Sequence, residues 1–332
     1  MRIFLLGDFQ SDNGPGNANK QIKKSLSLKY EIEYSRAIGK VGRIFEMYKG
    51  VCHADMLIIC SKSKINYQAV KLAKVKGKKI IYLMHGYSSY EHKIEYPDVS
   101  DKELKKIYKY EHFIFDSVDR IVCVSNRCMN YMKSQLPQYA DKFDYIFNVV
   151  DIENIERLCR NTSANKRINQ VLSVGGGMKR KNILSLVEAA GNKNVVVVGK
   201  TLSDGDKIRE YNNVIWYEHL MHDDILKLMT ESSLYIQNSI FETFCLAVVE
   251  ALFAGCSILV SDAVGCLDLF DNLLDEDVIY DVFDQQEISN KMKYLLKNPN
   301  NERLLEGFKK ELVSKEWQAN RWQEIINSII SM

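Results

Sequence analysis

The sequence predicts an α/β protein built from two Rossmann-like domains, each with a doubly wound parallel sheet. Short β-rich apolar runs alternate with longer amphipathic runs along the whole chain, which is typical of parallel strands joined by helices. The 332 residues exceed one ordinary core and suit two domains of about 150 residues each. A polar stretch at residues 160–170 predicts the linker between them.

Each half of the chain repeats the alternation of strand and helix. In residues 1–150 we predict strands at 2–6, 31–35, 56–60, 79–84, 120–124 and 145–147, and helices near 17–28, 40–49, 67–76, 101–117 and 127–134. In residues 151–332 we predict strands at 171–174, 195–198, 214–216, 234–237, 257–260 and 278–280, and helices near 183–190, 223–230, 244–254 and 287–296. We therefore expect an N-terminal domain at 1–155, a C-terminal domain at 165–315, and a helix at 316–332 that packs back on the first domain. Groups at the carboxyl ends of the strands would line a ligand cleft between the domains.

Composition indicates a cytoplasmic protein without a metal site. The apolar content of 46% and the charged content of 27% are those of soluble globular proteins, and no apolar run reaches the roughly 18 residues that cross a bilayer. The eight cysteines form no C-x-x-C pair. Free thiols in a reducing compartment are therefore expected, rather than disulfides or a metal centre.

The two halves differ in charge. Residues 1–150 carry 25 Lys and Arg against 16 Asp and Glu, whereas residues 151–332 carry 20 against 27. The basic excess fits a solvated helix surface, or attraction to an anionic membrane surface or a phosphate-bearing acceptor. No nucleic-acid-binding motif accompanies it, so we expect no nucleic-acid partner.

The segment 238–255 places two carboxylates in an apolar run. Glu242 precedes the run, and Glu250 is the only charge between Phe244 and Phe253. A helix that is apolar nearly all round is buried, and a carboxylate there needs a dedicated hydrogen-bond partner or a polar ligand. A structural salt bridge is the alternative. Backbone amides at the start of this helix could bind a phosphate, while Glu250 could accept hydrogen bonds from ribose hydroxyls.

A second candidate site follows the predicted strand at 171–174. This strand runs into three glycines and then into Lys179, Arg180 and Lys181. Cations at a helix start repel the positive end of its dipole. The arrangement therefore favours an anion bound between them, such as a diphosphate held by the cations and by backbone amides.

Two weaker candidates lie in the first half. His85 directly follows the predicted strand at 79–84 and would face a ligand crevice, with a capping or core histidine as the alternative. The glycine-containing loop 7–19 could approach an anion. It lacks the G-x-G-x-x-G pattern, which disfavours a dehydrogenase. The histidines to which we assign no role are His92, His112, His219 and His222.

Together these segments resemble a known family. Residues 238–265, NSIFETFCLAVVEALFAGCSILVSDAVG, resemble the E-x7-E region of retaining family 4 glycosyltransferases with the GT-B fold. In the family's order the chain also has the early glycine loop, HG at 85–86, DRIVCVS at 119–125, NVVD at 148–151 and VGGGMKRKN at 174–182. The resemblance covers nearly the whole chain, although only the block 242–255 is specific by itself.

The resemblance implies a role for each matching residue. His85 would contact the donor sugar and the transition state, Glu242 the transferred sugar, and Lys181 the diphosphate leaving group. Glu250 would bind the ribose. The other implied donor-binding residues are Gly14, Gly16, Gly175, Lys179, Arg180, Phe244, Cys245 and Leu246. No metal ion or other cofactor is implied, because cations and amides stabilise the leaving group, and a UDP-sugar is the favoured donor substrate.

Four positions depart from the family pattern. Gly176 stands where the family has Arg, so Lys179 or Arg180 would reach the phosphates instead, or the site would be weaker. Thr243 and Cys245 replace two glycines and constrain the phosphate loop. Val149 replaces a further glycine in the interdomain turn.

The function implied is a retaining hexosyltransferase that moves a sugar from a nucleoside diphosphate to a hydroxyl of a glycan or lipid-linked acceptor. We expect a role in cell-surface polysaccharide biosynthesis, in the cytoplasm or peripherally on the inner face of the membrane, with the basic N-terminal domain on an anionic surface. The alternatives are a nucleotide-sugar epimerase of the same fold and a catalytically silent partner subunit.

Overall fold

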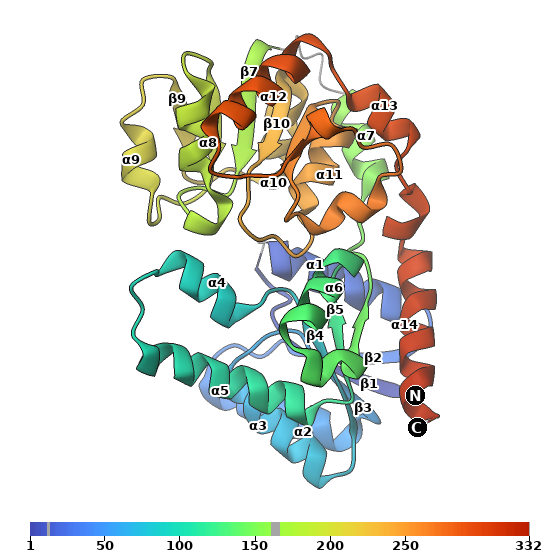
Figure 1. Ribbon diagram of the computed structural model, residues 1–332. Coiled ribbons are helices and arrows are strands. Elements are labelled where there is room, and N and C mark those ends of the chain that lie inside the picture. Colours follow the sequence, from blue (N-terminus) through green and yellow to red (C-terminus); the bar gives the residue numbers. More distant parts are fainter. Residues whose placement is uncertain (12–13, 161–166, 332) are drawn as a thin grey trace. The chain divides into compact units, whose positions relative to one another are not determined.

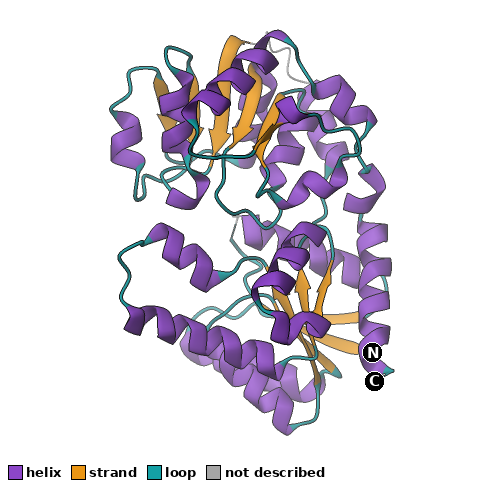
Figure 2. Ribbon diagram, viewed as in Figure 1, coloured by secondary structure: helices purple, strands orange, loops and turns teal. Residues whose placement is uncertain are grey.

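The chain folds into two compact units, each with its own six-stranded parallel sheet (Figures 1 and 2). The computed structural model describes residues 1–11, 14–160 and 167–331. The first unit consists of Met1–Val149 and Glu311–Met332, and the second of Val150–Lys310. The predicted fold class, two doubly wound α/β units, is confirmed.

The sheet of the first unit, sheet A, has the strand order β2-β1-β3-β4-β5-β6. Its central strands are buried along nearly their whole length because helices cover both faces, as in other parallel sheets. Its strands are β1 (Arg2–Leu6), β2 (Glu31–Tyr34), β3 (Met56–Ile59), β4 (Lys79–Met84), β5 (Arg120–Cys123) and β6 (Phe143–Tyr145).

Seven helices belong to the described part of the first unit. They are α1 (Gly14–Leu26), α2 (Lys40–His53), α3 (Lys64–Val75), α4 (Ser88–Glu95), α5 (Asp101–Ser117), α6 (Asn126–Gln135) and α14 (Lys315–Ile330). Helices α2, α3 and α5 lie side by side (Figure 1). Serine side chains cap four of these helices, among them Ser63 before α3 and Ser100 before α5, which satisfies amides that the first turn leaves without partners.

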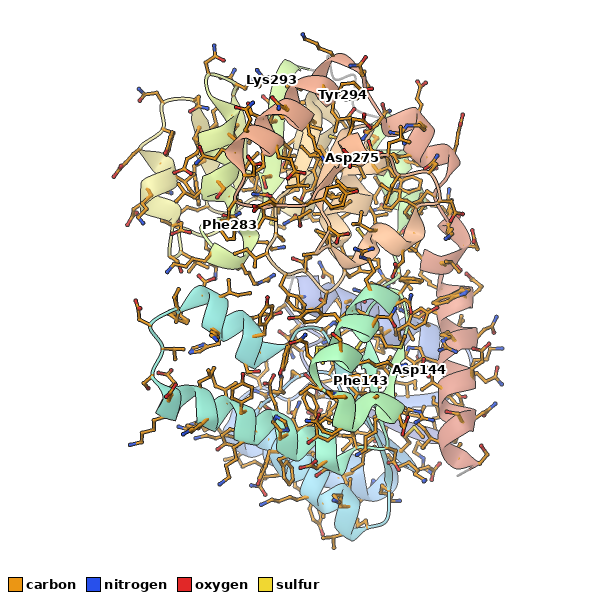
Figure 3. All side chains as sticks on the ribbon, in the orientation of Figure 1. Phe143, Asp144, Asp275, Phe283, Lys293 and Tyr294 are labelled. Carbon is orange, nitrogen blue, oxygen red and sulfur yellow. The ribbon has the colours of Figure 1, made fainter. Side chains whose placement is uncertain are left out.

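Helix α14 returns to the first unit after the chain has completed the second. Its Trp322 is fully buried, and Gln318 donates to the carbonyl of Phe147 over 2.8 Å. Arg321 forms an ion pair with Asp144 of β6, labelled in Figure 3, and it also donates to the carbonyl of Tyr145. Burying a large side chain such as Trp322 contributes roughly 2–3 kcal/mol or more, so α14 is an integral part of this unit.

The sheet of the second unit, sheet B, has the order β12-β11-β10-β7-β8-β9. Its strands are β7 (Arg167–Val174), β8 (Val195–Val198), β9 (Val214–Tyr217), β10 (Ser232–Gln237), β11 (Ser257–Ser261) and β12 (Val278–Ile279). Its helices are α7 (Ile152–Arg160), α8 (Ile183–Ala190), α9 (Gly205–Arg209), α10 (His222–Glu231), α11 (Leu246–Phe253), α12 (Gln285–Lys297) and α13 (Asn301–Glu306). Residues of α8 and α12 pack with the central strands into one apolar core.

Some predicted boundaries are wrong. Strand β7 begins at Arg167, so the end of the predicted linker 160–170 is strand; residues 161–166 lie outside the described part. Helices α4, α7, α9 and α13 were not predicted, because they are short or carry few apolar residues at helical spacing. The last strand of sheet A is Phe143–Tyr145 rather than 145–147, since it pairs in register with Ile121 to Cys123.

Candidate functional site

The carboxyl edge of sheet B brings together the two segments that carry the predicted carboxylates and cations. Strands β7 and β10 are neighbours in the sheet, so the loops that follow them lie side by side. A second loop, after β11, holds the segment around Glu242. The amide of Glu242 donates to Ala263 over 3.3 Å, and its carbonyl accepts from Gly265 over 2.9 Å. The backbone of Glu242 thus forms a parallel β-bridge with Val264 in the loop after β11.

The carboxylate of Glu242 is paired with two cations. Arg180 Nη1 lies 3.1 Å from Glu242 Oε2, and Lys181 Nζ contacts the same oxygen. Burial raises the pKa of Glu242, but Lys181 and Arg180 more than offset it, so that the pKa lies below its ordinary value. Glu242 is therefore ionised near neutral pH. Of the three cations, all within the described residues, Lys179 alone does not pair with it.

This pairing corrects one expectation about the cations. The sequence favoured an external anion between Lys179, Arg180 and Lys181, whereas in the structure a carboxylate of the chain itself lies against two of them. The cations also do not sit on the first turn of α8. They form a short 3₁₀ turn, η2 (Lys179–Lys181), and Asn182 with φ 47° separates it from the helix. Repulsion from the helix dipole is reduced by this geometry.

The three glycines before η2 pack against the loop that follows β8. The amides of Gly175 and Gly176 both donate to Val198, and that of Gly177 donates to Lys200. These donors are used within the chain. The absence of a side chain at Gly175 lets the Lys181 side chain pack closely against the backbone, because a Cβ there would lie 2.8 Å from Lys181.

Gly176 has a steric reason to be glycine. Its φ is 62°, and a Cβ would lie 2.3 Å from the carbonyl oxygen of Lys200. Neither the backbone conformation nor the space admits a side chain. The arginine that the family pattern places here therefore cannot be accommodated by this backbone, and Arg180 supplies the guanidinium beside Glu242.

A buried polar network supports the loop between β10 and α11. Gln237 donates to Ser239 over 2.7 Å, and its Oε1 accepts from the Tyr235 hydroxyl and from the Cys245 thiol. Cys245 has φ 75°, in the left-handed region that a non-glycine residue rarely adopts. Burial raises the pKa of its thiol to about 11. The thiol is thus protonated and acts as a packing and hydrogen-bonding group.

Helix α11 carries Glu250 to a different partner. His222 Nε2, from the first residue of α10, lies 3.0 Å from Glu250 Oε1. The hydrogen bond to Glu250 raises the pKa of His222, and burial opposes the shift. The Glu250 side chain is 15% exposed, so it lies at the edge of the apolar helix and is not sealed within the core. Glu250 thus has the dedicated partner that its surroundings require.

His85 lies at the end of β4 in the first unit, against Asn19 of α1. The distance from His85 Nε2 to Asn19 Oδ1 is 2.7 Å, and Asn19 Nδ2 donates to the carbonyl of Asp8 over 2.9 Å. Burial lowers the pKa of His85 to about 4. The imidazole is therefore neutral at physiological pH.

Gly14 and Gly16 lie in the first turn of α1 rather than in a loop. The helix begins at Gly14, three residues earlier than predicted, because proline is tolerated in a first helical turn, where its missing N–H is not needed. A helix N-terminus at this position keeps the positive dipole end that the glycine loop was expected to provide.

The sequence does not predict three of the residues that hydrogen-bond to the candidate site residues. His222 was given no role, and neither Asn19 nor Gln237 was singled out. No local pattern marks them, because their partners lie 28, 66 and 8 residues away along the chain. For Asn19, the signal available was an amide near the start of the predicted helix that follows the first strand and its glycine-containing loop.

The described part of the chain holds no cluster of three His, Cys, Asp or Glu side chains that could bind a metal ion. All eight cysteines are free thiols. Among the described residues, no helix combines the length and apolarity that a transmembrane span demands.

Residues 152–311 match the family model of glycosyl transferases group 1. Among solved structures, HepE from Anabaena in complex with UDP and glucose has a TM-score of 0.68 at 16% identity, with both chains covered completely. Sucrose-phosphate synthase from Thermosynechococcus elongatus has a TM-score of 0.72 at 15% identity over 99% of each chain. WaaG, a glycosyltransferase involved in lipopolysaccharide biosynthesis, has a TM-score of 0.59 at 15% identity over 99% of this chain and 95% of its own. No curated protein sequence matches significantly. At these identities the structural likeness shows the fold, which is GT-B.

Proposed function

We propose that the protein is a retaining, metal-independent glycosyltransferase, and the match of residues 152–311 to the family model of glycosyl transferases group 1 is the premise of this proposal. It moves a hexose-type sugar from a nucleoside diphosphate, with UDP favoured, to a hydroxyl of a glycan or lipid-linked acceptor. The likeness of the fold to HepE in complex with UDP-glucose supports a UDP-sugar donor.

The observation that carries the proposal is the cluster of Glu242, Arg180 and Lys181. Two cations on one carboxylate leave a net positive charge at the carboxyl edge of sheet B, where open α/β sheets bind ligands. A diphosphate would add the negative charge that this cluster lacks. Such charge-assisted hydrogen bonds are among the strong ones.

In the proposed reaction, the bond between the sugar C1 and the diphosphate oxygen breaks, and its electron pair leaves with the phosphate. Arg180 and Lys181 stabilise the charge that develops there, as preorganised cations do in electrostatic catalysis. The acceptor oxygen bonds to C1 from the face that the diphosphate leaves, and its proton passes to the departing phosphate. These cations supply the function that a metal ion would otherwise provide.

The remaining roles divide between the units. In the second unit, Glu242 contacts the transferred sugar, Glu250 binds the ribose, and the amides at Phe244 to Leu246 face the phosphates. In the first unit, neutral His85 contacts the sugar, and the N-terminus of α1 at Gly14 and Gly16 approaches the donor phosphate. We place the reaction in cell-surface polysaccharide biosynthesis, in the cytoplasm or peripherally on the inner face of the membrane.

A thermal-shift panel of nucleotide sugars, with and without chelator, tests donor binding. A donor at 100 times its dissociation constant should add about 2.7 kcal/mol to the free energy of unfolding, and chelator should leave the shift unchanged. If no nucleotide sugar shifts the melting temperature, the proposal fails. A shift that chelator abolishes would refute metal independence.

Transfer of radiolabelled sugar to a membrane extract tests catalysis. Glu242→Gln should mainly lower kcat, whereas Glu250→Gln should mainly raise the KM for the donor. Equal effects on both parameters would contradict the division of roles. Donor binding without transfer by the wild type would indicate the silent partner subunit. The observation in favour of that alternative is that the amides of Gly175 to Gly177 already donate to carbonyls of the chain itself. An epimerised sugar nucleotide formed without acceptor would indicate the epimerase.

A further inference from the structure

Helix α2 exposes a continuous apolar stripe to solvent. Val41, Ile44, Phe45 and Tyr48 are 83%, 54%, 70% and 57% exposed, and Ile38 just before the helix is 86% exposed. The spacing 41, 44, 45, 48 follows one face of a helix. Single exposed apolar residues are ordinary, but a contiguous patch on a soluble unit indicates an interaction surface.

Packing in the first unit leaves this stripe uncovered. Met47, Gly50 and Val51 are the buried residues of α2. Gly50 brings the helix close to β1, because a Cβ there would lie 2.6 Å from the Phe4 ring. The apolar surface of α2 is thus wider than the face that sheet A covers. The excess forms the stripe, which we call the α2 stripe (Ile38, Val41, Ile44, Phe45, Tyr48).

Basic residues surround the α2 stripe. Helices α2 and α3 together carry six Lys and Arg and a single acidic residue, Glu46. The carboxylate of Glu46 accepts from the amides of Arg36 and Ala37 at 2.8 and 3.0 Å, so it is directed to the chain itself. The exposed cations of the two helices are Lys40, Arg43, Lys49, Lys64, Lys71 and Lys74.

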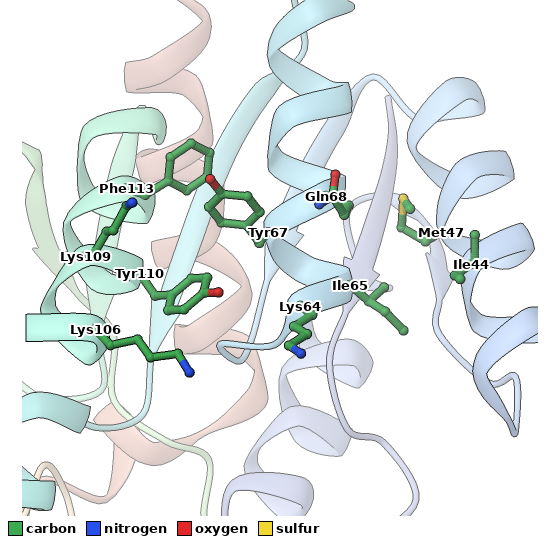
Figure 4. A pocket seen from close by; sticks show the side chains of 10 residues that line it. All are labelled: Ile44, Met47, Lys64, Ile65, Tyr67, Gln68, Lys106, Lys109, Tyr110 and Phe113. Atoms are coloured by element: carbon green, nitrogen blue, oxygen red, sulfur yellow. The ribbon is translucent and has the colours of Figure 1, made fainter. Parts of the chain in front are cut away.

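A pocket of about 860 Å³ continues the same surface across α3 towards α5. Figure 4 shows its lining in the order α5, α3, α2, with Lys106 on α5, Lys64 on α3, and Ile44 and Met47 on α2. Tyr110 of α5 and Tyr67 of α3 have ring centroids 5.7 Å apart. The pocket therefore combines ammonium groups with aromatic and aliphatic walls.

The charge of this surface selects its occupant. A second copy of the chain would bring the six cations of α2 and α3 against their own equivalents, and like charges repel. An anionic lipid surface would instead attract them, while the apolar stripe entered the boundary between headgroups and acyl chains. Helices with apolar residues on one face and Lys and Arg beside them bind membranes in this way.

We propose that the α2 stripe and the neighbouring Lys64–Lys106 pocket form a docking surface for an anionic phospholipid bilayer, with α2 lying in the plane of the interface. The proposal assigns a specific surface to the membrane contact suggested above. It does not depend on glycosyl transfer, so a failure of one can be told from a failure of the other.

Vesicle flotation tests the proposal without any activity assay. The full chain should float with vesicles of phosphatidylglycerol and phosphatidylcholine in equal parts, and should remain unbound with phosphatidylcholine alone. Binding should fall steeply between about 0.1 M and 1 M salt, because salt screens exposed charges. The double variant Ile44→Ser, Phe45→Ser should lose at least about tenfold in partitioning.

A matched control comes from the second unit. Phe283 and Tyr294, labelled in Figure 3, are 62% and 46% exposed, so the double variant Phe283→Ser, Tyr294→Ser removes similar exposed apolar surface. It should bind like the wild type. Both double variants should keep the wild-type melting temperature, since none of the four side chains is buried. A third variant, Lys40→Ser with Lys49→Ser, should weaken binding and flatten its salt dependence.

Three outcomes would overturn the proposal. The wild type does not float with anionic vesicles, or the Ile44/Phe45 variant binds as well as the wild type, or binding is equal on neutral vesicles. A wild type that is dimeric without vesicles, together with a monomeric Ile44/Phe45 variant, would show that a second copy covers the stripe and would also refute it.

Discussion

The side-chain oxygen of Asn19 lies 2.7 Å from Nε2 of His85. The other side-chain atom of this amide, Nδ2, donates to the carbonyl of Asp8, and a flipped amide would bring two oxygens together there. Because Oδ1 only accepts, His85 must donate through Nε2–H. Nδ1 of this neutral ring is then the unprotonated nitrogen, so Asn19 selects the tautomer that His85 presents.

We predict that ¹⁵N NMR of the histidine rings will show His85 protonated at Nε2 alone at neutral pH. Asn19→Asp should raise the pKa of His85 from about 4, because a carboxylate replaces a neutral acceptor and stabilises the imidazolium. The resonances of the other histidines should not move. A His85 protonated at Nδ1 in the wild type would contradict the assignment.

The same residue predicts a pH dependence of stability. The folded pKa of His85 lies below its unfolded value of about 6.5, so between pH 6.5 and 4 only the unfolded state takes up the proton. The contribution of His85 is therefore complete above about pH 6.5 and is lost as the pH falls towards 4. Urea unfolding of the wild type and of His85→Gln should show a steeper loss for the wild type in that window.

His222 should titrate in the opposite sense. Its hydrogen bond to Glu250 raises its pKa, so the stabilisation is present below about pH 6.5 and is lost as the pH rises through the folded pKa. Glu250→Gln should lower the pKa of His222 in an NMR titration. Asp223→Asn is the matched control, because Asp223 is the smallest of the contributing causes. An unchanged pKa in Glu250→Gln would show that the two side chains do not interact in solution.

Gly176 and Gly191 allow the steric constraint at the candidate site to be measured. Their φ angles are 62° and 63°, but a Cβ at Gly191 meets nothing within 4 Å, whereas one at Gly176 clashes with Lys200. Gly191→Ala should cost about 1–3 kcal/mol for the backbone alone, because φ 63° with ψ −116° is a conformation that residues with a Cβ rarely adopt. Gly176→Ala should cost at least about 2 kcal/mol more in chemical denaturation, since backbone must move. Equal costs would mean that the loop after β8 yields freely.

Backbone strain at Cys245 gives a further prediction. Because its φ is 75°, Cys245→Gly should be more stable than Cys245→Ala by about 1 kcal/mol. Cys256 is also buried and does not have a positive φ, so there the order should reverse, with Ala more stable by about 0.5–1 kcal/mol. Comparing Ala with Gly at each position cancels the loss of the thiol. The same order at both positions would exclude strain at Cys245.

Local pattern was sufficient to predict the α/β class and most elements. The four consecutive valines of β8 and the apolar stretch of α11 are long enough, or β-rich enough, for their type to be clear, and α5 was predicted with its boundaries at Asp101 and Ser117. His85 and the glycines before η2 were predicted as candidate site residues because each follows a predicted strand, and the carboxyl ends of parallel strands lie at one edge of a sheet. Short elements such as α4 and α9 lack that signal, and tertiary packing determines them.

The sequence by itself determined that two carboxylates, three cations and one histidine follow strands of parallel sheets. Only the tertiary structure decided their partners: Glu242 with Arg180 and Lys181, 62 and 61 residues away, and Glu250 with His222. Strand order sets the first of these pairings, since β7 and β10 are distant in sequence yet adjacent in sheet B, and the packing of α10 against α11 sets the second. The exposed α2 stripe was likewise decided by packing, because an apolar helical face has the same pattern whether sheet A covers it or not.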